Sequence, residues 1–167
     1  MPKIIIIRGA AGVGKTVVSK NVAKVLKGKY VSMDKIVDNK KNKLYKDKEK
    51  GMISQKSFLK ANKLLLTKFN KEIKDGKILI IDGCFYWKSQ IMNFKKRFGQ
   101  DLLVFTLKAS LKTCIRRDNK RKKPIGKDAI GAVYNASTKF DCGILIDTNK
   151  RNVYGVVGEI VRKIKIN

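Results

Sequence analysis

The segment from Gly9 to Thr16 reads Gly-Ala-Ala-Gly-Val-Gly-Lys-Thr and matches the pattern G-x-x-x-x-G-K-[ST] (Walker A) in full. An isoleucine-rich run at 3–8 precedes it and predicts a buried strand, while the periodicity of 17–27 predicts a helix. Glycines let successive backbone N–H groups turn toward a phosphate, and the following helix directs its positive N-terminal end at the same anion. A chance match in a turn is the alternative, but the flanking strand and helix argue against it. The pattern therefore predicts binding of a nucleoside triphosphate.

The predicted roles within this loop follow from the chemistry of its side chains. Lys15 would reach the β- and γ-phosphate oxygens, and the hydroxyl of Thr16 would be a ligand of Mg²⁺. ATP and Mg²⁺ are thus the expected cofactors. The residues expected to bind the nucleotide are Gly9, Ala10, Ala11, Gly12, Val13, Gly14, Lys15 and Thr16.

Length and composition restrict the class of protein. A chain of 167 residues is long enough to bury a core without disulfides or structural metal, so we expect one domain over residues 1–167. Its three cysteines never form a C-x-x-C pair and it has no histidine, which argues against a zinc site and favours a reduced, cytoplasmic location. The N-terminal apolar run stops after Ile7, so we expect neither a signal peptide nor a membrane span.

The chain is strongly basic, with 40 Lys and Arg against 13 Asp and Glu and a net charge of +27. An AT-rich genome favours lysine codons, but it should also favour glutamate, which occurs only at Glu49, Glu72 and Glu159. A field this positive attracts RNA or single-stranded nucleic acid, although it does not make nucleic acid the substrate.

Apolar runs alternate with segments of helical period along the whole chain. The runs that predict buried parallel strands are 3–8, 30–33, 78–82, 102–107 and 144–147. Helices are predicted over 54–74, around the stripe from Trp87 to Phe98, from an N-cap at Ser110 through Arg117, and from Val153 toward the end. This alternation indicates an α/β fold in which helices cover both faces of a parallel sheet, and ligands of such sheets bind beyond the carboxyl ends of the strands.

Three carboxylates stand at predicted strand ends. Asp34 is placed to accept a proton from an attacking hydroxyl or to hold a magnesium-bound water, with a helix N-cap as its structural alternative. Asp82 closes an apolar strand in the manner of a Walker B carboxylate and is the candidate metal ligand, with strand-end capping as its alternative. For Asp147 a structural role is the better interpretation.

Two missing side chains narrow the enzyme class. No glutamate follows Asp82, whereas ATPases that hydrolyse ATP for work commonly place a water-activating glutamate there, so the sequence favours a phosphotransferase. The segment 149–152 resembles the guanine-reading motif N-K-x-D but ends in Asn152, and an amide cannot accept both guanine N–H bonds.

A cationic segment from Arg116 to Lys127 contains Pro124 and Gly126, which bracket a loop. Arginines on a closing lid neutralise the charge that phosphoryl transfer concentrates on the γ-phosphoryl oxygens. We therefore expect a lid over about 117–127, with a merely solvated basic loop as the alternative.

Taken together, the loop 9–16, Asp34, Asp82 and the run from Leu107 to Arg121 resemble the small P-loop kinases. This group includes shikimate kinase, adenylylsulfate kinase, and the chloramphenicol phosphotransferase-like and polynucleotide kinase-like enzymes. The resemblance implies a three-layer α/β/α fold like that of nucleoside monophosphate kinases, with a five-stranded parallel sheet ordered 2-3-1-4-5 and an acceptor-binding region over about 34–76. It also implies Asp34 as the base, Arg117 and Arg121 as lid arginines, and an adenine-side loop at Thr148, with Arg117 and Thr148 as further nucleotide-binding residues.

The sequence departs from two members of that group. Ser32 stands where shikimate kinases have the first aspartate of D-x-D, and Asp82-Gly83-Cys84 replaces their G-G-G, which argues against shikimate as the acceptor. Adenylylsulfate kinase is not matched outside the shared core. A lysine stripe at 56–74 is either the solvent-exposed face of a helix or a surface that binds the phosphate backbone of a nucleic acid. The aromatic residues on which bases could stack are Tyr45, Phe85, Tyr86 and Trp87.

The sequence therefore favours an ATP-dependent kinase that transfers the γ-phosphate to a hydroxyl acceptor, either a small molecule or a 5′-OH nucleic acid. The alternative is a nucleotide-regulated RNA-binding ATPase with slow hydrolysis.

Overall fold

The computed structural model describes residues 1–166 and contains a five-stranded parallel sheet. Its strands are β1 (Ile4–Arg8), β2 (Lys29–Ser32), β5 (Leu79–Gly83), β6 (Leu102–Lys108) and β7 (Ile144–Asp147). They lie in the order β2-β5-β1-β6-β7. Counted among these five strands alone, the order is 2-3-1-4-5, so the predicted topology is confirmed. The labels run higher because a separate hairpin, β3 (Lys48–Glu49) and β4 (Met52–Ile53), interrupts the count.

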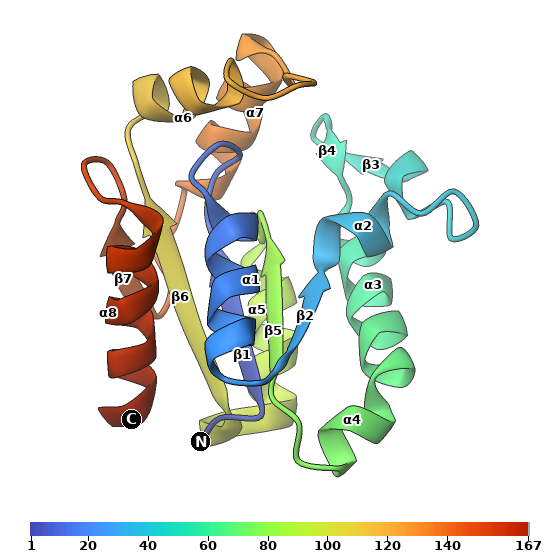
Figure 1. Ribbon diagram of the computed structural model, residues 1–167. Helices are drawn as coiled ribbons and strands as arrows, with labels where there is room; N and C mark the ends of the chain where they lie inside the picture. Colours follow the sequence, from blue (N-terminus) through green and yellow to red (C-terminus); the bar gives the residue numbers. More distant parts are fainter. Residues whose placement is uncertain (167) are drawn as a thin grey trace.

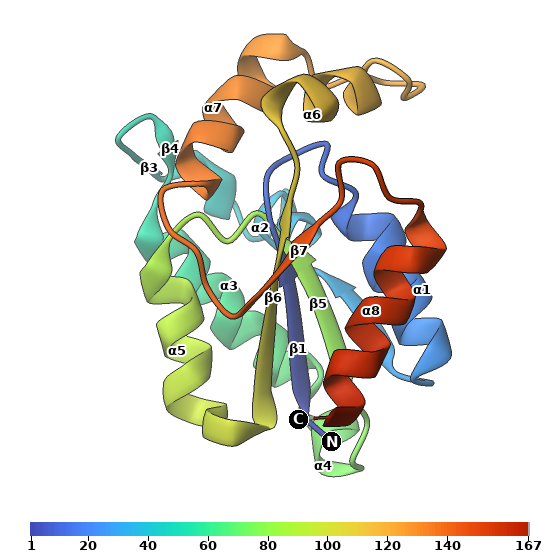
Figure 2. The same ribbon diagram turned by 90° about the vertical axis from the view of Figure 1, so that its left-hand side faces the viewer.

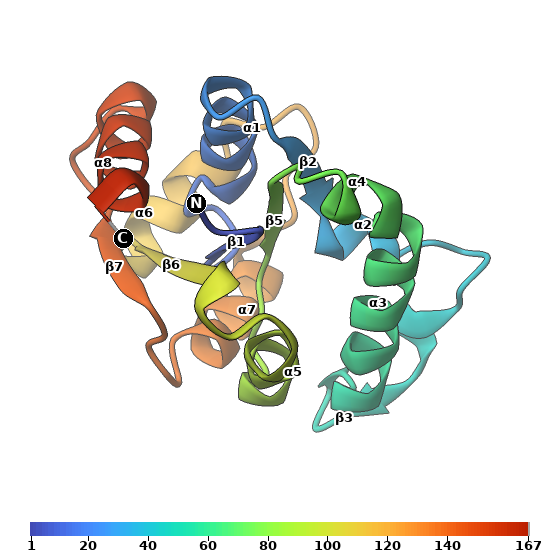
Figure 3. The same ribbon diagram turned by 90° about the horizontal axis from the view of Figure 1, so that it is seen from below.

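Helices cover both faces of the sheet, which gives the predicted three layers (Figure 3). One face packs against α1 (Lys15–Val25) and α8 (Val153–Ile166), through Ile5 and Ile7 of the central strand. The other face packs against α3 (Gln55–Lys68) and α5 (Lys88–Phe98), through Ile4 and Ile6. Successive side chains of a strand point to opposite faces, so an unbroken isoleucine run supplies both cores.

The predicted helix over 54–74 is wrong in one respect, because it is two helices. α3 ends at Lys68, and a short helix, α4 (Asn70–Lys74), follows after Phe69. Phe69 is buried in the core, and its backbone leaves the helical region with φ −107° and ψ 18°. Lys71 and Lys74 therefore do not continue the lysine stripe of α3.

Most of the remaining elements lie at the carboxyl end of the sheet; the exception is the turn at 99–101, which precedes β6 and so lies at the amino end. α2 (Met33–Val37) directly follows β2, and the 3₁₀ turn η1 (Leu44–Lys46) leads into the hairpin. A second 3₁₀ turn, η2 (Gly99–Asp101), precedes β6, after which α6 (Leu111–Asp118) and α7 (Lys127–Ser137) form a cap. Figures 1 and 2 show this cap above the strand ends, with the hairpin beside it. Among residues 1–166, no helix has both the length and the apolar character that crossing a bilayer requires.

Candidate active site

The loop between β1 and α1 curls because its glycines adopt conformations that other residues avoid. Gly9, Gly12 and Gly14 have φ of 148°, 82° and 101°. A Cβ on Gly9 would stand 2.5 Å from the carbonyl oxygen of Leu107, and one on Gly12 the same distance from that of Cys114. The loop is therefore pressed against β6 and α6, and these positions admit only glycine.

Lys15 begins α1 and is buried, and its ammonium donates a 2.8 Å hydrogen bond to the carbonyl of Ala10. The side chain thus lies across the loop. A buried ammonium beside a ring of backbone N–H groups and a helix N-terminus forms a strongly anion-attracting pocket.

Thr16 and Asp82 meet beneath the loop. The Thr16 hydroxyl donates to Oδ2 of Asp82 at 2.7 Å, while the Tyr30 hydroxyl donates to Oδ1 at 3.2 Å. Burial and the nearby carboxylate raise the pKa of Tyr30, so it remains a donor at neutral pH. A hydroxyl and a carboxylate side by side fit Mg²⁺, which prefers oxygen ligands and takes its remaining ones from water and phosphates. No cluster of three or more acidic, cysteine or histidine side chains that could hold a metal occurs within residues 1–166.

Asp34 lies on α2 at the wall of a cavity of about 900 Å³ in front of the loop. Burial raises the pKa of Asp34, Lys15 opposes this rise, and Asp82 adds to it. The thiol of Cys84 donates to Oδ2 of Asp34 at 4.0 Å. Burial raises the pKa of Cys84 itself to about 11, which keeps the sulfur protonated and able to donate.

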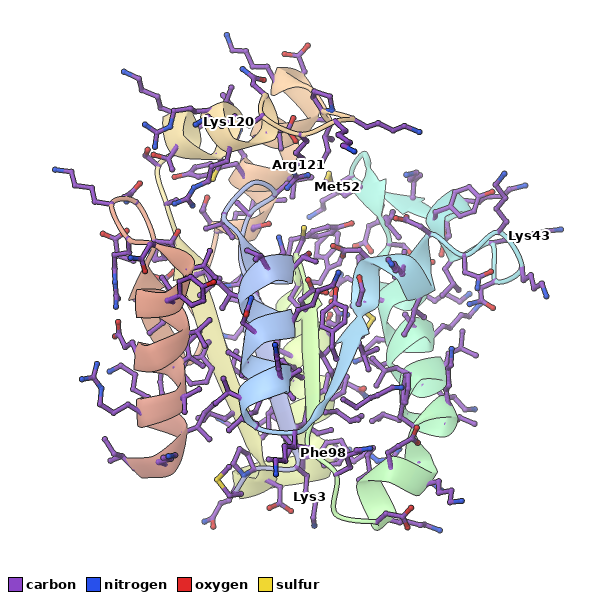
Figure 4. The ribbon with its side chains drawn as sticks, in the orientation of Figure 1. Lys3, Lys43, Met52, Phe98, Lys120 and Arg121 are labelled. Carbon is purple, nitrogen blue, oxygen red and sulfur yellow. The ribbon has the colours of Figure 1, made fainter. Side chains whose placement is uncertain are left out.

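The cavity has four walls that the chain brings together from distant segments. The phosphate loop and the start of α1 form its floor, and Asp34, Val37 and Asp38 come from α2 and its end. The hairpin contributes Lys48, Gly51, Met52 and Ile53, and the aromatic side consists of Phe58 and Tyr86. The cap contributes Arg121, Ile125 and Val133. Figure 4 shows Met52 of the hairpin and Arg121 of the cap facing each other above the strand ends.

A second cavity, of about 470 Å³, adjoins the first on the side of β7. Its lining includes Val13, Thr148 and Val153, and four residues line both cavities, namely Gly12, Gly14, Val17 and Arg121. A ligand that crosses the phosphate loop would therefore have one end in each cavity. Gly9 and Ala10 line neither of these two cavities; Gly9 instead packs against β6.

Arg117 and Arg121 occupy different environments, although both were predicted as lid arginines. The Arg117 guanidinium donates to the carbonyl of Val13 at 3.1 Å, to the Thr148 hydroxyl at 3.1 Å and to the Thr148 carbonyl at 2.5 Å. It thus ties α6 to the phosphate loop and to the segment after β7. Arg121 is half-exposed, pairs with Asp118 at 3.3 Å and faces both cavities.

Sequence reasoning missed Asp118, which organises the loop of the cap. Its carboxylate is 1% exposed, and Oδ2 accepts hydrogen bonds from the backbone N–H groups of Ile125 and Gly126 at 2.9 and 3.1 Å. Asp118 is the sole acidic residue in the cationic segment, and its isolation among cations could have identified it as a structural carboxylate.

Asp147 is the third of the predicted strand-end carboxylates. It accepts hydrogen bonds from the backbone and side-chain N–H groups of Asn149 and so caps its loop.

Sequence reasoning also missed Arg8, a fully buried cation at the end of β1. Its guanidinium donates to the carbonyls of Phe85, Ser137 and Phe140 and to the hydroxyl of Thr106, and it lies 4.3 Å above the Phe140 ring. It therefore joins the segment after β5, at Phe85, to β6 and to the C-terminal end of α7.

The candidate stacking residues separate in the structure. Tyr86 lines the first cavity, Phe85 is fully buried in the core, and Trp87 donates a 2.8 Å hydrogen bond from its indole nitrogen to the carbonyl of Ile53. Tyr45 lies in η1 and lines neither of the two cavities beside the loop.

Comparisons with known proteins agree with this geometry. A family described as an AAA domain matches residues 5–141, which is most of the chain. Among solved structures, a gluconokinase from Sinorhizobium meliloti aligns over 98% of this chain and 92% of its own, with TM-score 0.74 and 11% identity. A shikimate kinase from Bacteroides thetaiotaomicron aligns over 97% and 98%, with TM-score 0.64 and 16% identity. A deoxyadenosine kinase from M. mycoides, solved with dCMP and dCDP, aligns over 97% and 98%, with TM-score 0.56 and 20% identity. The fold is that of the small P-loop kinases.

Proposed function

Because the chain belongs to the AAA domain family and has the fold of small P-loop kinases, we propose that it is an ATP-dependent phosphotransferase. The observation that carries the proposal is the position of Asp34. This carboxylate lines the cavity in front of the phosphate loop together with Lys15 and Thr16, where a kinase needs a proton acceptor.

In the proposed reaction, the acceptor hydroxyl oxygen forms a bond to the γ-phosphorus, and the bond from that phosphorus to the β,γ-bridging oxygen breaks. The hydroxyl proton passes to Asp34, and ADP leaves with the bridging electrons. Lys15 and Arg121 stabilise the charge on the transferring group from two sides. Thr16 and Asp82 would hold Mg²⁺, whose charge would offset that of the phosphate oxygens.

The nucleotide is proposed to lie along the residues shared by the two cavities. Its base would occupy the smaller cavity beside Thr148, and its triphosphate would cross the loop at Gly12–Thr16. Arg117 acts here mainly by position, because its donors are already engaged with Val13 and Thr148. It fixes the position of the smaller cavity, which would hold the base, relative to the phosphate loop.

The test is phosphoryl transfer from γ-labelled ATP to a panel of small hydroxyl compounds and 5′-OH oligonucleotides. We expect wild-type protein to label at least one acceptor, and Asp34→Asn to abolish transfer while ATP binding persists. Lys24→Gln, an exposed substitution on α1 away from the cavities, is the matched control. Transfer that survives Asp34→Asn would remove Asp34 as the base.

A second candidate function is RNA binding, because a separate basic groove lies on the other side of α2. It is a cavity of about 910 Å³ between α2 and α3, and its lining contains Lys35, Lys60, Lys63 and Lys68. No acidic residue is among the described residues that line it, and the ion pairs found within residues 1–166 involve none of these lysines.

A salt titration of RNA binding tests this second function. Each phosphate contact adds about 0.7 to the slope of log affinity against log salt for a single strand. We expect Lys60→Gln with Lys63→Gln to reduce the slope, and Lys95→Gln with Lys96→Gln on the exposed face of α5 to leave it unchanged. Binding that does not depend on salt would exclude the groove as a nucleic-acid site.

A further inference from the structure

The acceptor side of the first cavity has an unusual charge for a phosphotransfer site in so basic a protein. Apart from the phosphate loop and α1, its charged lining residues are Asp34, Asp38, Lys48 and Arg121. Arg121 also lines the smaller cavity and so belongs to the nucleotide side. The acceptor side therefore presents two carboxylates and one ammonium.

Lys48 lies near enough to one of these carboxylates, Asp38, for their charges to interact. Burial raises the pKa of Asp38, and the positive charge of Lys48 acts in the opposite direction, so the two groups lie within electrostatic reach of each other. Among the described residues that line the first cavity, Arg121 is the one arginine; it pairs with Asp118 and also lines the smaller cavity, where we propose that the nucleotide lies. An acceptor with a carboxylate or phosphate would meet the two carboxylates of Asp34 and Asp38 against the single ammonium of Lys48, and like charges in a partly buried cavity repel.

The rest of the acceptor side is apolar and partly flat. The rings of Phe58 and Tyr86 meet edge to face with centroids 5.1 Å apart. Met52 and Ile53 of the hairpin and Ile125 and Val133 of the cap also line the cavity. Apolar side chains around a few convergent polar groups form the usual lining of a pocket for a small organic ligand.

One backbone carbonyl of the hairpin, that of Ile53, connects the hairpin to the aromatic side of the cavity. The carbonyl of Ile53 accepts a 2.8 Å hydrogen bond from the Trp87 indole and a 3.4 Å hydrogen bond from the Tyr86 hydroxyl. The hairpin is thereby attached to the aromatic side rather than free to swing away. Lys50 and Gly51 form its tight turn with φ of 52° and 75°.

We propose that the acceptor is an uncharged alcohol that carries a flat, largely apolar ring, and that Asp38 is a specificity-determining residue that rejects anionic acceptors. The ring would lie against the apolar lining that Phe58, Tyr86, Met52 and Ile53 form, with its hydroxyl directed at Asp34. This inference rests on the proposed phosphotransferase function. Nucleosides and aryl alcohols share the required chemistry.

Two measurements on the full-length protein separate this inference from the proposed function. Binding is followed by the fluorescence of Trp87, the one tryptophan of the chain, in the presence of a non-hydrolysable ATP analogue. Transfer is followed with γ-labelled ATP. The acceptors are nucleosides, their 3′-monophosphates with the same free 5′-hydroxyl, aryl alcohols, shikimate, gluconate, glucose and a 5′-OH oligonucleotide.

We expect nucleosides or aryl alcohols to bind and react with a kcat/KM at least about tenfold above that of the matched monophosphates and of the non-aromatic acids. Comparison of nucleosides with aryl alcohols identifies which of these two classes is the acceptor. Asp38→Asn should reduce by about tenfold the ratio of kcat/KM for neutral acceptors to kcat/KM for anionic acceptors. Asp75→Asn, which removes the same charge from an exposed turn outside the cavity, should leave the ratio unchanged.

Preferred transfer to gluconate, shikimate, a monophosphate or the oligonucleotide would overturn the inference and leave the kinase function standing. Glucose as good as any ring alcohol would also overturn it. Ring alcohols that change Trp87 fluorescence but accept no phosphate would support the inference on ligand class and refute the kinase function. An unchanged acceptor ratio in Asp38→Asn would remove Asp38 as the specificity residue.

Discussion

The hydroxyl of Thr16 donates a 2.7 Å hydrogen bond to the carboxylate of Asp82, although the two residues lie 66 positions apart in the chain. β1 and β5 are neighbours in the sheet, with Ile7 opposite Asp82, so the start of α1 lies over the end of β5. The pair thus joins the phosphate loop to the strand that ends beside the acceptor cavity.

We expect Thr16→Ala and Asp82→Asn each to lower magnesium-dependent phosphoryl transfer by about a hundredfold, which corresponds to ~2.7 kcal/mol of transition-state stabilisation. Thr16→Ser keeps the hydroxyl and should retain most of the activity. The measurement is kcat as a function of Mg²⁺ concentration for the three variants. Equal activity of the alanine and serine variants would show that the hydroxyl is not a metal ligand.

Arg117 and Arg121 should respond differently to truncation. Arg117→Ala removes three hydrogen bonds that hold α6 to the loop and to Thr148, and hydrogen bonds to a charged group contribute about 1.5–3 kcal/mol. We expect a lower free energy of unfolding and weaker ATP binding. Arg121→Ala should slow transfer roughly a hundredfold at saturating ATP, and it should also lower stability because it leaves the buried Asp118 carboxylate without its cation.

Urea denaturation and single-turnover transfer distinguish the two arginines. If Arg121→Ala unfolded as readily as Arg117→Ala and transferred phosphate normally, the division of roles between these arginines would be wrong. Arg117→Lys replaces two donor nitrogens with one, so it cannot make both the contacts of Nη1 with Val13 and the Thr148 hydroxyl and the contact of Nη2 with the Thr148 carbonyl, and its stability should lie below that of the wild type.

The sheet and the phosphate loop were predictable because their signals are local. Each strand is a nearly continuous apolar run, and the loop pattern lies in one stretch of sequence. The same holds for Ser110, whose side chain accepts a hydrogen bond from the backbone N–H of Thr113 and so caps α6 as predicted.

The walls of the acceptor cavity were not predictable, because they depend on contacts between distant segments. Each strand of the hairpin has two residues and so shows no alternation of polar and apolar side chains. Arg8 finds its acceptors 77 to 132 positions away, and nothing near it in the sequence shows that its charge is buried. The break at Phe69 arises because the ring packs into the core, which overrides the helical propensity of 54–74.

Arg8→Lys should destabilise the protein by about 2–4 kcal/mol, because an ammonium cannot serve the four acceptors that the guanidinium serves, and each orphaned buried carbonyl is costly. Urea denaturation should show a lower midpoint with an unchanged slope. The same change in the exposed Arg97 is the control and should alter stability by less than about 0.5 kcal/mol. A urea midpoint equal to that of the wild type would contradict the stabilising role of the Arg8 guanidinium.

The pH profile of transfer should carry the signature of Asp34. A general base acts only when ionised, and burial raises the pKa of Asp34, so activity should fall on the acid side at a higher pH than for an ordinary aspartate. The backbone N–H of Cys84 lowers the pKa of Asp34, and the thiol donates a further, longer hydrogen bond of 4.0 Å to Oδ2, which also favours the ionised form. Cys84→Ala removes that donor and should move the acid limb of kcat upward, whereas Cys84→Ser supplies a stronger donor and should move it downward.

Substitution of Asp38 should shift the pKa of Asp34 in the direction opposite to that expected for Cys84→Ala. The negative charge of Asp38 raises the pKa of Asp34, so Asp38→Asn should shift the acid limb to lower pH. The conservative change Cys142→Ser, at a half-buried thiol outside the acceptor cavity, should leave the limb in place. The measurement is kcat between pH 4 and 8 at saturating ATP and acceptor, which reports ionisation in the bound complex. A limb that does not move in any of the Cys84 and Asp38 variants would mean that a group other than Asp34 sets the acid side of the profile.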